Sequence, residues 1–154
     1  LGDLSFFYDM NSIGNRHTPP NLRIILINNG KGIEFRNYRH PAENFGAEAD
    51  PYMAAAGHFG DQSPELVKHY AADLGFRYYT ASTKEEFLQL EGMLVSPDKT
   101  DSPALIEIFT TTEDESKALE LISNIYKDKS IKQMAKRLLG ENGTKNLKKI
   151  LGRN

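Results

Sequence analysis

The sequence contains no cysteine. A chain without cysteine can form neither a disulfide framework nor a thiolate metal site, which excludes disulfide-stapled folds and cysteine-type zinc sites. It also shows no leading apolar segment of the kind found in signal peptides and no apolar run long enough to cross a membrane. We therefore expect a cytoplasmic protein with no membrane partner.

Two kinds of catalytic site also have little support. His58 and His69 have no carboxylate at a spacing that would bind a metal ion with them, and His17 is interpreted as a surface turn residue. Asp9 and the acidic pair at 114–115 are not placed together on one crevice, as glycoside hydrolysis requires. The sequence favours neither a histidine-based metal site nor a glycosidase.

The 154 residues suffice for one domain with one core, but charge is distributed unevenly along them. Residues 127–154 carry nine Lys or Arg and two acids, a net charge of +7 within a chain of net charge −2. A basic tail can contact nucleic acid, but we expect a helical extension that docks on the acidic body, residues 1–126, and no nucleic-acid partner. The apolar residues of the extension repeat at helical spacing: Ile131, Met134, Ala135, Leu138 and Leu139, then Leu147, Ile150 and Leu151.

The body alternates helical and extended patterns, which is typical of parallel strands joined by helices. A helix is predicted over residues 4–16, before Pro19 and Pro20, where a helix cannot continue. The apolar run 22–27 that follows is typical of a strand covered on both faces, so we expect it to be central in the sheet. Residues 31–62 are predicted to form a long loop.

The second half of the body continues the alternation. Ser63 and Pro64 open a predicted helix that Gly75 ends, and Thr83 with Glu86 forms a capping box at the start of another. The remaining predicted elements are strands over 76–80 and 104–110 and an acidic helix over 113–126. The pattern predicts an α/β fold, a three-layer αβα arrangement with a mainly parallel sheet.

Polar residues stand at the ends of two neighbouring segments. Asp3 lies at the start of the first predicted helix, and Asn28-Asn29-Gly30 follows the first strand. Ligands of open α/β sheets bind outside the carboxyl ends of the strands, often against helix N-termini. Carboxylate and carboxamide oxygens suit magnesium, which commonly accompanies a diphosphate. These residues therefore predict a magnesium and diphosphate site.

The start of the first helix can also contribute to such a site. Gly2 would let the backbone approach a diphosphate closely, and the amides of Leu4 and Ser5 and the Ser5 hydroxyl could donate hydrogen bonds to it. The chain enters this motif immediately after Leu1, with no room for a preceding strand. We therefore expect a fragment of a longer polypeptide, with its fold truncated at the N-terminus.

The residues from Gly2-Asp3-Leu4-Ser5 through Asn28-Asn29 resemble the GD...NN motif of the thiamine diphosphate (ThDP) enzymes. The resemblance covers residues 1–126 and implies the diphosphate-binding domain of that family, with thiamine diphosphate and Mg²⁺ as cofactors. The implied metal ligands are Asp3, Asn29 and the backbone oxygen of Lys31, a position usually occupied by glycine. The implied cofactor-binding residues are Gly2, Asp3, Leu4, Ser5, Asn29, Lys31, Gly32 and Ile33.

Within the family, Leu4 and the residues around it match the menaquinone-pathway branch. The segment from Lys31 to Gln62 departs from that branch, so an acetolactate-synthase-like or phosphonopyruvate-decarboxylase-like enzyme stays open. In this segment Arg36, Arg39 and His40 could bind a substrate carboxylate or phosphonate, although a solvated loop of mixed charge is the simpler interpretation.

The resemblance implies a decarboxylase or carboligase that acts next to the carbonyl of a 2-oxo acid. The family's activating glutamate belongs to a separate N-terminal domain, usually of a partner subunit, and no position here matches it. The catalytic residues are therefore unknown, with Glu34 and Phe35 as candidates to face the substrate. We expect the fragment alone to be inactive and the parent to form a homodimer or homotetramer. The alternative is a noncatalytic αβα assembly or regulatory domain with a degenerate diphosphate site.

Overall fold

The computed structural model describes residues 1–35, 40–53, 62–98 and 100–125, and the chain divides into two compact units, Leu1–Glu115 and Ser116–Asn154. The basic extension predicted over 127–154 lies outside the described residues. No described helix is both long enough and apolar enough to cross a membrane.

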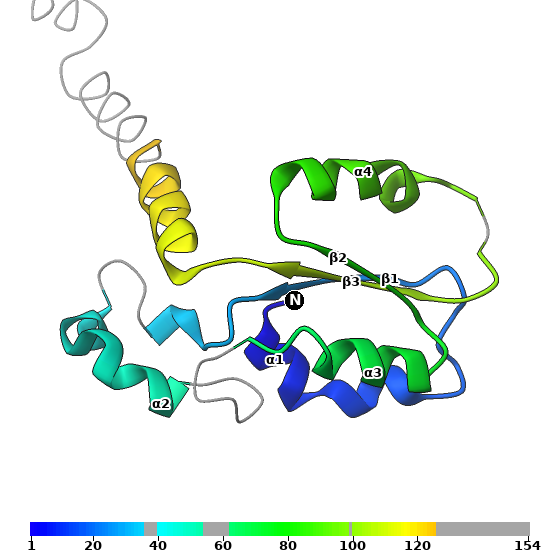
Figure 1. Ribbon diagram of the computed structural model, residues 1–154, viewed down its shortest axis with the longest axis horizontal. Coiled ribbons are helices and arrows are strands. Elements are labelled where there is room, and N and C mark those ends of the chain that lie inside the picture. The colour runs from blue at the N-terminus through cyan, green and yellow to red at the C-terminus, as the bar shows by residue number, and fades with distance from the viewer. Residues whose placement is uncertain (36–39, 54–61, 99, 126–154) are drawn as a thin grey trace, which may run out of the picture. The chain divides into compact units, whose positions relative to one another are not determined.

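The described residues of the first unit form a parallel sheet of three strands in the order β1-β3-β2 (Figure 1). The strands are β1 (Arg23–Asn28), β2 (Arg77–Ala81) and β3 (Ala104–Phe109). Helix α4 (Lys84–Val95) covers one face of the sheet, and α1 (Asp3–Tyr8) and α3 (Leu66–Asp73) cover the other (Figure 1). The predicted α/β fold with helices on both faces of a parallel sheet is confirmed.

The buried core lies between the sheet and the pair α1 and α3. Ile24 and Leu26 alternate along β1 and therefore point to one face, while Val67 and Ala71 lie four residues apart on α3 and share one side of that helix. Burial of each large aliphatic side chain contributes on the order of 2 kcal/mol. The core cluster consists of Phe6, Ile24, Leu26, Val67, Ala71, Phe76 and Leu105.

The prediction that the first strand is central is wrong for the described sheet. Strand β3 occupies the middle, and its first four residues are all buried, whereas Ile25 on β1 is 37% exposed. The apolar runs of the two strands look alike, and only pairing decides which is flanked on both sides. On the other side of β1 the N-terminal ammonium of Leu1 donates to the Ile25 carbonyl, and the Leu1 carbonyl accepts from Ile27, each at 2.8 Å.

The helix predicted over residues 4–16 is also not continuous. Helix α1 ends at Tyr8, Asp9 leaves the helical region with φ −128°, and a 3-10 helix, η1 (Met10–Gly14), follows. Asn, Ser and Gly in this second piece are weak helix formers, which explains the break. Both pieces still turn apolar side chains toward the core, because Phe6 is buried and Phe7, Met10 and Ile13 pack against it.

The elements predicted after residue 62 are confirmed with small shifts at their ends. Strand β2 is shifted by one residue at each end from its predicted range, β3 ends one residue earlier than predicted, and a helix occupies residues 112–125. Helix α3 begins later than predicted, at Leu66, with Glu65 rather than Ser63 at its N-cap, although the Ser63 hydroxyl still accepts from the Leu66 amide at 3.2 Å. Gly75, with φ 76°, ends α3 in a conformation that glycine adopts without strain.

The described residues of the segment predicted as a loop contain three short helices, η2 (Ile33–Phe35), η3 (Pro41–Ala49) and α2 (Asp50–Met53). The 3-10 geometry of η2 and η3, the non-helical Gly46 inside η3 and the four-residue length of α2 leave no long helical periodicity to detect. The Lys31 ammonium pairs with Asp50 at 2.8 Å, and the Gly32 amide donates to the Met53 carbonyl at 2.7 Å. These contacts hold α2 near the residues that follow β1.

The capping box of α4 gives a direct test of local stability. The Thr83 hydroxyl accepts from the Glu86 amide at 3.2 Å, and the Glu86 carboxylate accepts from the Thr83 amide. We expect Thr83→Ala to lower the free energy of unfolding by about 1 kcal/mol, because one amide of the first turn loses its acceptor. Urea denaturation would measure the change, with Thr83→Ser as the control that keeps the hydroxyl. An equal loss in both variants would contradict the capping role.

Candidate functional site

The turn after β1 is formed by two asparagines that bind the backbone ahead of them. The Asn28 side-chain oxygen accepts from the Gly30 amide at 2.9 Å, and the Asn29 side-chain oxygen accepts from the Lys31 amide at 2.9 Å. Such contacts two residues ahead are Asx turns, which asparagine favours. Gly30 has φ 79°, a left-handed conformation that glycine adopts readily. The local sequence therefore determines the shape of this turn.

Asp3 joins this turn to the start of α1. Its Oδ2 accepts from the amides of Asn29 at 3.1 Å and Gly30 at 2.6 Å, while its Oδ1 accepts from the Leu4 amide at 2.7 Å. The side chain is only 2% exposed. Burial raises the pKa of Asp3, and hydrogen bonds from these amides act in the opposite direction. One buried carboxylate thus organises two separate segments.

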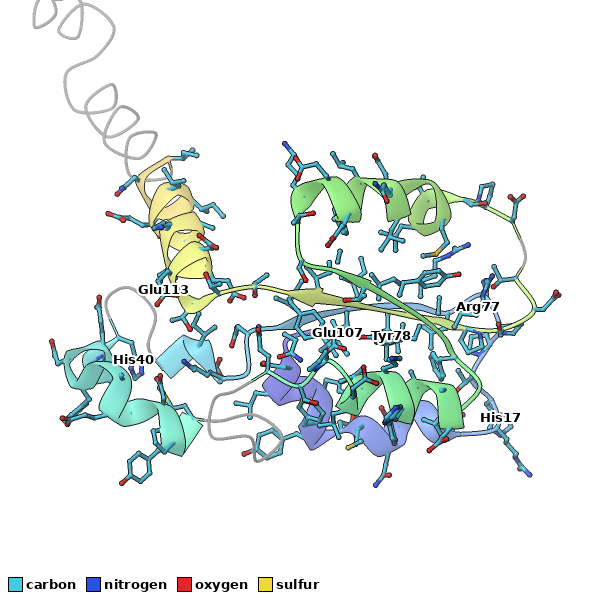
Figure 2. All side chains as sticks on the ribbon, in the orientation of Figure 1. His17, His40, Arg77, Tyr78, Glu107 and Glu113 are labelled. Carbon is cyan, nitrogen blue, oxygen red and sulfur yellow. The ribbon has the colours of Figure 1, made fainter. Side chains whose placement is uncertain are left out.

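A second buried carboxylate lies beneath the turn, in the middle of β3. Glu107 accepts from the Asn28 side-chain amide at 2.5 Å and from the Tyr78 hydroxyl at 2.6 Å. Figure 2 shows Glu107 and Tyr78 close together at the sheet. Burial is the main cause that raises the pKa of Glu107, and burial followed by the hydrogen bond to Glu107 raises that of Tyr78. The network links all three strands.

The helix after β3 contributes a third carboxylate. The Thr111 hydroxyl accepts from the Asp114 amide at 3.2 Å and so caps the helix over 112–125. In its first turn, both oxygens of Glu115 accept from the Asn29 side-chain amide at 3.1 Å, and the Thr110 hydroxyl donates to the same carboxylate. The ends of β1 and β3 are therefore connected through side chains.

A polar cavity of about 240 Å³ opens beside this cluster. It lies at the carboxyl ends of the parallel strands, where ligands of open α/β sheets bind. The Gln62 side chain lines this cavity and donates to the carbonyls of Asn28 at 2.6 Å and Thr110 at 2.8 Å. The cavity is lined by Asn29, Lys31, Gln62, Thr110, Thr111, Thr112 and Glu113.

The structure brings two residues predicted as metal ligands together, because the backbone amide of Asn29 donates to the Asp3 carboxylate. Lys31 follows them and lines the cavity. Gly2 precedes α1 with nothing near the position of a Cβ, which leaves room for close approach. The Leu4 amide, predicted to donate to a diphosphate, donates to Asp3 instead, while Ser5 is exposed.

The remaining predicted site residues are spread beyond this cluster. Gly32 and Ile33 are buried and Glu34 is exposed, while the Phe35 side chain lies outside the described part, as do Arg36, Arg39 and His58. His40 caps η3, since its Nδ1 accepts from the Ala42 amide at 3.1 Å. His69 pairs with Glu65 at 3.2 Å on the exposed side of α3.

Glu107, Glu115 and Gln62 are among the site residues that the sequence does not predict. A lone carboxylate inside an apolar strand, as at Glu107, must be buried with partners, but the sequence does not indicate which partners. From the sequence, Glu115 is only a possible member of a carboxylate pair. Gln62 had no local pattern that distinguished it from an ordinary loop residue.

The donor set fits a magnesium ion shared with a diphosphate. No cluster of three or more His, Asp or Glu able to hold a metal occurs among the described residues, so phosphate oxygens would have to complete the coordination. A carboxylate has about four acceptor sites, and three amides occupy three of those on Asp3. No described basic side chain forms an ion pair with this buried group. A cation would therefore favour its ionised form.

These features agree with the resemblance to ThDP enzymes. Comparison with known proteins tests that resemblance. No protein-family model matches the chain. Proteins named 2-succinyl-5-enolpyruvyl-6-hydroxy-3-cyclohexene-1-carboxylate synthase are similar to it in several bacteria. The Bacteroides thetaiotaomicron protein is 31% identical over 120 residues, 78% of this chain and 20% of that protein. The Desulfotalea psychrophila protein is 35% identical over 113 residues, 71% of this chain and 18% of that protein.

A third relative, from Phocaeicola vulgatus, is 31% identical over 130 residues, 84% of this chain and 22% of its own length. The chain thus spans about a fifth of the length of the curated relatives it matches. The resemblance to the ThDP enzymes is confirmed. The chain is homologous to a segment of proteins named 2-succinyl-5-enolpyruvyl-6-hydroxy-3-cyclohexene-1-carboxylate synthase.

The raised pKa of Glu107 predicts how stability depends on pH. Because the folded state holds this proton more tightly, the favourable contribution is complete below the ordinary pKa of 4.5 and is lost as pH rises through the raised value. Glu107→Gln has no proton to lose. We therefore expect its free energy of unfolding to increase relative to wild type as pH rises through that range.

Urea denaturation at a series of pH values would measure this difference. Glu91→Gln, at an exposed position of α4, is the matched control and should show no such trend. A difference between Glu107→Gln and wild type that does not change with pH would contradict the assignment of a raised pKa.

Proposed function

We propose that this chain is the cofactor-diphosphate part of a ThDP- and Mg²⁺-dependent 2-oxo acid decarboxylase or carboligase. The observation that carries the proposal is the contact between Asp3, at the start of α1, and the Asn29–Gly30 turn, at the end of β1. The homology to synthases favours a carboligating member of the menaquinone-pathway branch.

The chain's own residues have distinct roles in this proposal. Asp3, the Asn29 side-chain oxygen and the Lys31 carbonyl would hold magnesium, which suits their hard oxygens. Gly2 leaves space for phosphate at the start of α1. When bound, ThDP supplies the chemistry that makes or breaks a carbon–carbon bond next to a 2-oxo acid carbonyl, while the protein positions the reacting groups.

The substrate-facing part of the proposal concerns the residues after the turn. Ile33 is buried and apolar, whereas the neighbouring Glu34 is exposed and charged, so the two side chains would have different roles. Ile33 would form an apolar wall of the site, and Glu34 would face the substrate. The activating glutamate would come from another domain, so the chain alone would be inactive and the parent would act as a homodimer or homotetramer.

A noncatalytic assembly or regulatory αβα domain with a degenerate diphosphate site is the alternative. The two functions differ in what must accompany the chain. An enzyme requires an aminopyrimidine-binding domain with a suitably placed glutamate in the same polypeptide. The sequence of the full-length gene would distinguish them, and absence of that domain would favour the noncatalytic function.

Substitution of the two side-chain ligands tests the site itself. In the full-length protein, Asp3→Ala and Asn29→Ala should each abolish magnesium-dependent ThDP binding, because each removes an oxygen ligand of the metal. Isothermal titration calorimetry with ThDP, with and without Mg²⁺, would measure this. The matched controls are Asp73→Ala and Asn21→Ala, which make the same changes at exposed positions.

Both controls should bind ThDP as the wild type does. Thermal melting of all four variants would show whether a lost affinity reflects unfolding. Unchanged ThDP affinity in folded Asp3→Ala and Asn29→Ala would rule out the assigned site.

A further inference from the structure

We propose that Glu115 is a positioning residue for the metal site, acting by fixing the orientation of the Asn29 side-chain amide. The proposal rests on the proposed function, since it concerns a ligand of the same site. Glu115 lies in the first turn of the helix over 112–125, 86 residues after Asn29, and the sequence motif does not include it.

The argument begins with the asymmetry of the asparagine side chain. A carboxamide has one end that only accepts hydrogen bonds and one that only donates them. A magnesium ion requires the oxygen, so rotation of the amide by half a turn would present NH₂ to the cation. Affinity for metal therefore depends on which end of Asn29 faces the site.

Contacts at both ends of Asn29 favour the same orientation. Both Glu115 oxygens accept from its NH₂ at 3.1 Å, and its oxygen accepts from the Lys31 amide at 2.9 Å. In the opposite orientation the amide oxygen would face a carboxylate, and the NH₂ would face a backbone N–H. Each of the two contacts would become repulsive, so Glu115 excludes the orientation that cannot bind a cation.

Glu115 is itself held in place from two directions. The Thr110 hydroxyl donates to its Oε1, and its own amide donates to the Thr111 carbonyl at 3.1 Å in the first turn of the helix. Because that helix starts directly after β3 and β3 pairs with β1 in register up to Asn28 and Phe109, the carboxylate is delivered to the end of β1. The pairing of β1 with β3 therefore sets the position of the Glu115 carboxylate.

The neighbouring asparagine shows the same arrangement. The Asn28 NH₂ donates to Glu107 at 2.5 Å, and its oxygen accepts from the Gly30 amide at 2.9 Å. A carboxylate behind each asparagine thus directs the oxygen toward the turn. Glu107 acts within the core, whereas Glu115 acts on the residue that would contact the metal.

The test compares Glu115→Ala with Glu115→Gln in the full-length protein. The Mg²⁺ affinity at a fixed ThDP concentration would be measured by calorimetry, alongside Asp3→Ala. We expect Glu115→Ala to weaken Mg²⁺ binding about tenfold, as is common when a partner of a metal ligand is removed. Glu115→Gln keeps an oxygen that accepts from Asn29 and should stay close to wild type. Glu91→Ala is the control for loss of an exposed carboxylate.

A second measurement requires no cofactor. If Glu115 orients Asn29, its loss releases the Asn29 oxygen from the Lys31 amide, and hydrogen exchange at Lys31 should become faster in Glu115→Ala but not in Glu115→Gln. Exchange measured by mass spectrometry on peptides that span Lys31 would detect this. A merely stabilising residue would alter the melting temperature without this local selectivity.

The outcomes separate the two proposals. Absence of Mg²⁺ and ThDP binding in the wild type would overturn the proposed function, and exchange at Lys31 would still decide the role of Glu115. Wild-type affinity and exchange in Glu115→Ala would overturn the positioning role while leaving the site intact. Equal losses in the Ala and Gln variants would also overturn it, because they would show that charge, rather than amide orientation, matters.

Discussion

The Asp3 carboxylate is the interaction on which the rest of the site depends. It accepts hydrogen bonds from backbone amides in the turn after β1 and in the first turn of α1. It therefore fixes the end of β1 against the start of α1. A buried carboxylate is costly unless it is fully hydrogen-bonded. Its amide partners therefore cannot move independently, and the geometry of the whole strand-end cluster follows from this constraint.

The sheet beneath this cluster contains a second buried carboxylate, at a position where an apolar side chain would need no hydrogen-bond partner. Glu107 lies fully buried in the middle strand. It is hydrogen-bonded to Asn28 on one neighbouring strand and to Tyr78 on the other. An arrangement of this kind stabilises only one strand register, because a shift would leave the carboxylate without partners. The polar network thus specifies the register at the end of the sheet that carries the cavity.

The proposed function draws on the fold, the strand-end cluster and the homology together. The chain is homologous to synthases over most of its own length but spans about a fifth of theirs. Its strand-end cluster offers oxygen ligands and a polar cavity. In the proposed enzyme, this chain would anchor the cofactor and other domains would contribute the activating carboxylate.

The sequence by itself determined the local features, because those depend on contacts only a few residues apart. The Asx turns at Asn28 and Asn29, the capping box at Thr83 and the end of α3 at Gly75 all belong to this class. The GD...NN pattern also indicated the family, since a motif retains its residue types and spacing without reference to the fold.

Only the tertiary structure decided which strand is central and which distant side chains complete the site. The sequences of β1 and β3 are similarly apolar. Strand β3 is central because it pairs with both β1 and β2. Glu115 reaches Asn29 across 86 residues of sequence because parallel pairing brings the ends of β1 and β3 together. No local sequence pattern encodes such a contact, because the distance between the two side chains depends on the register of the whole sheet.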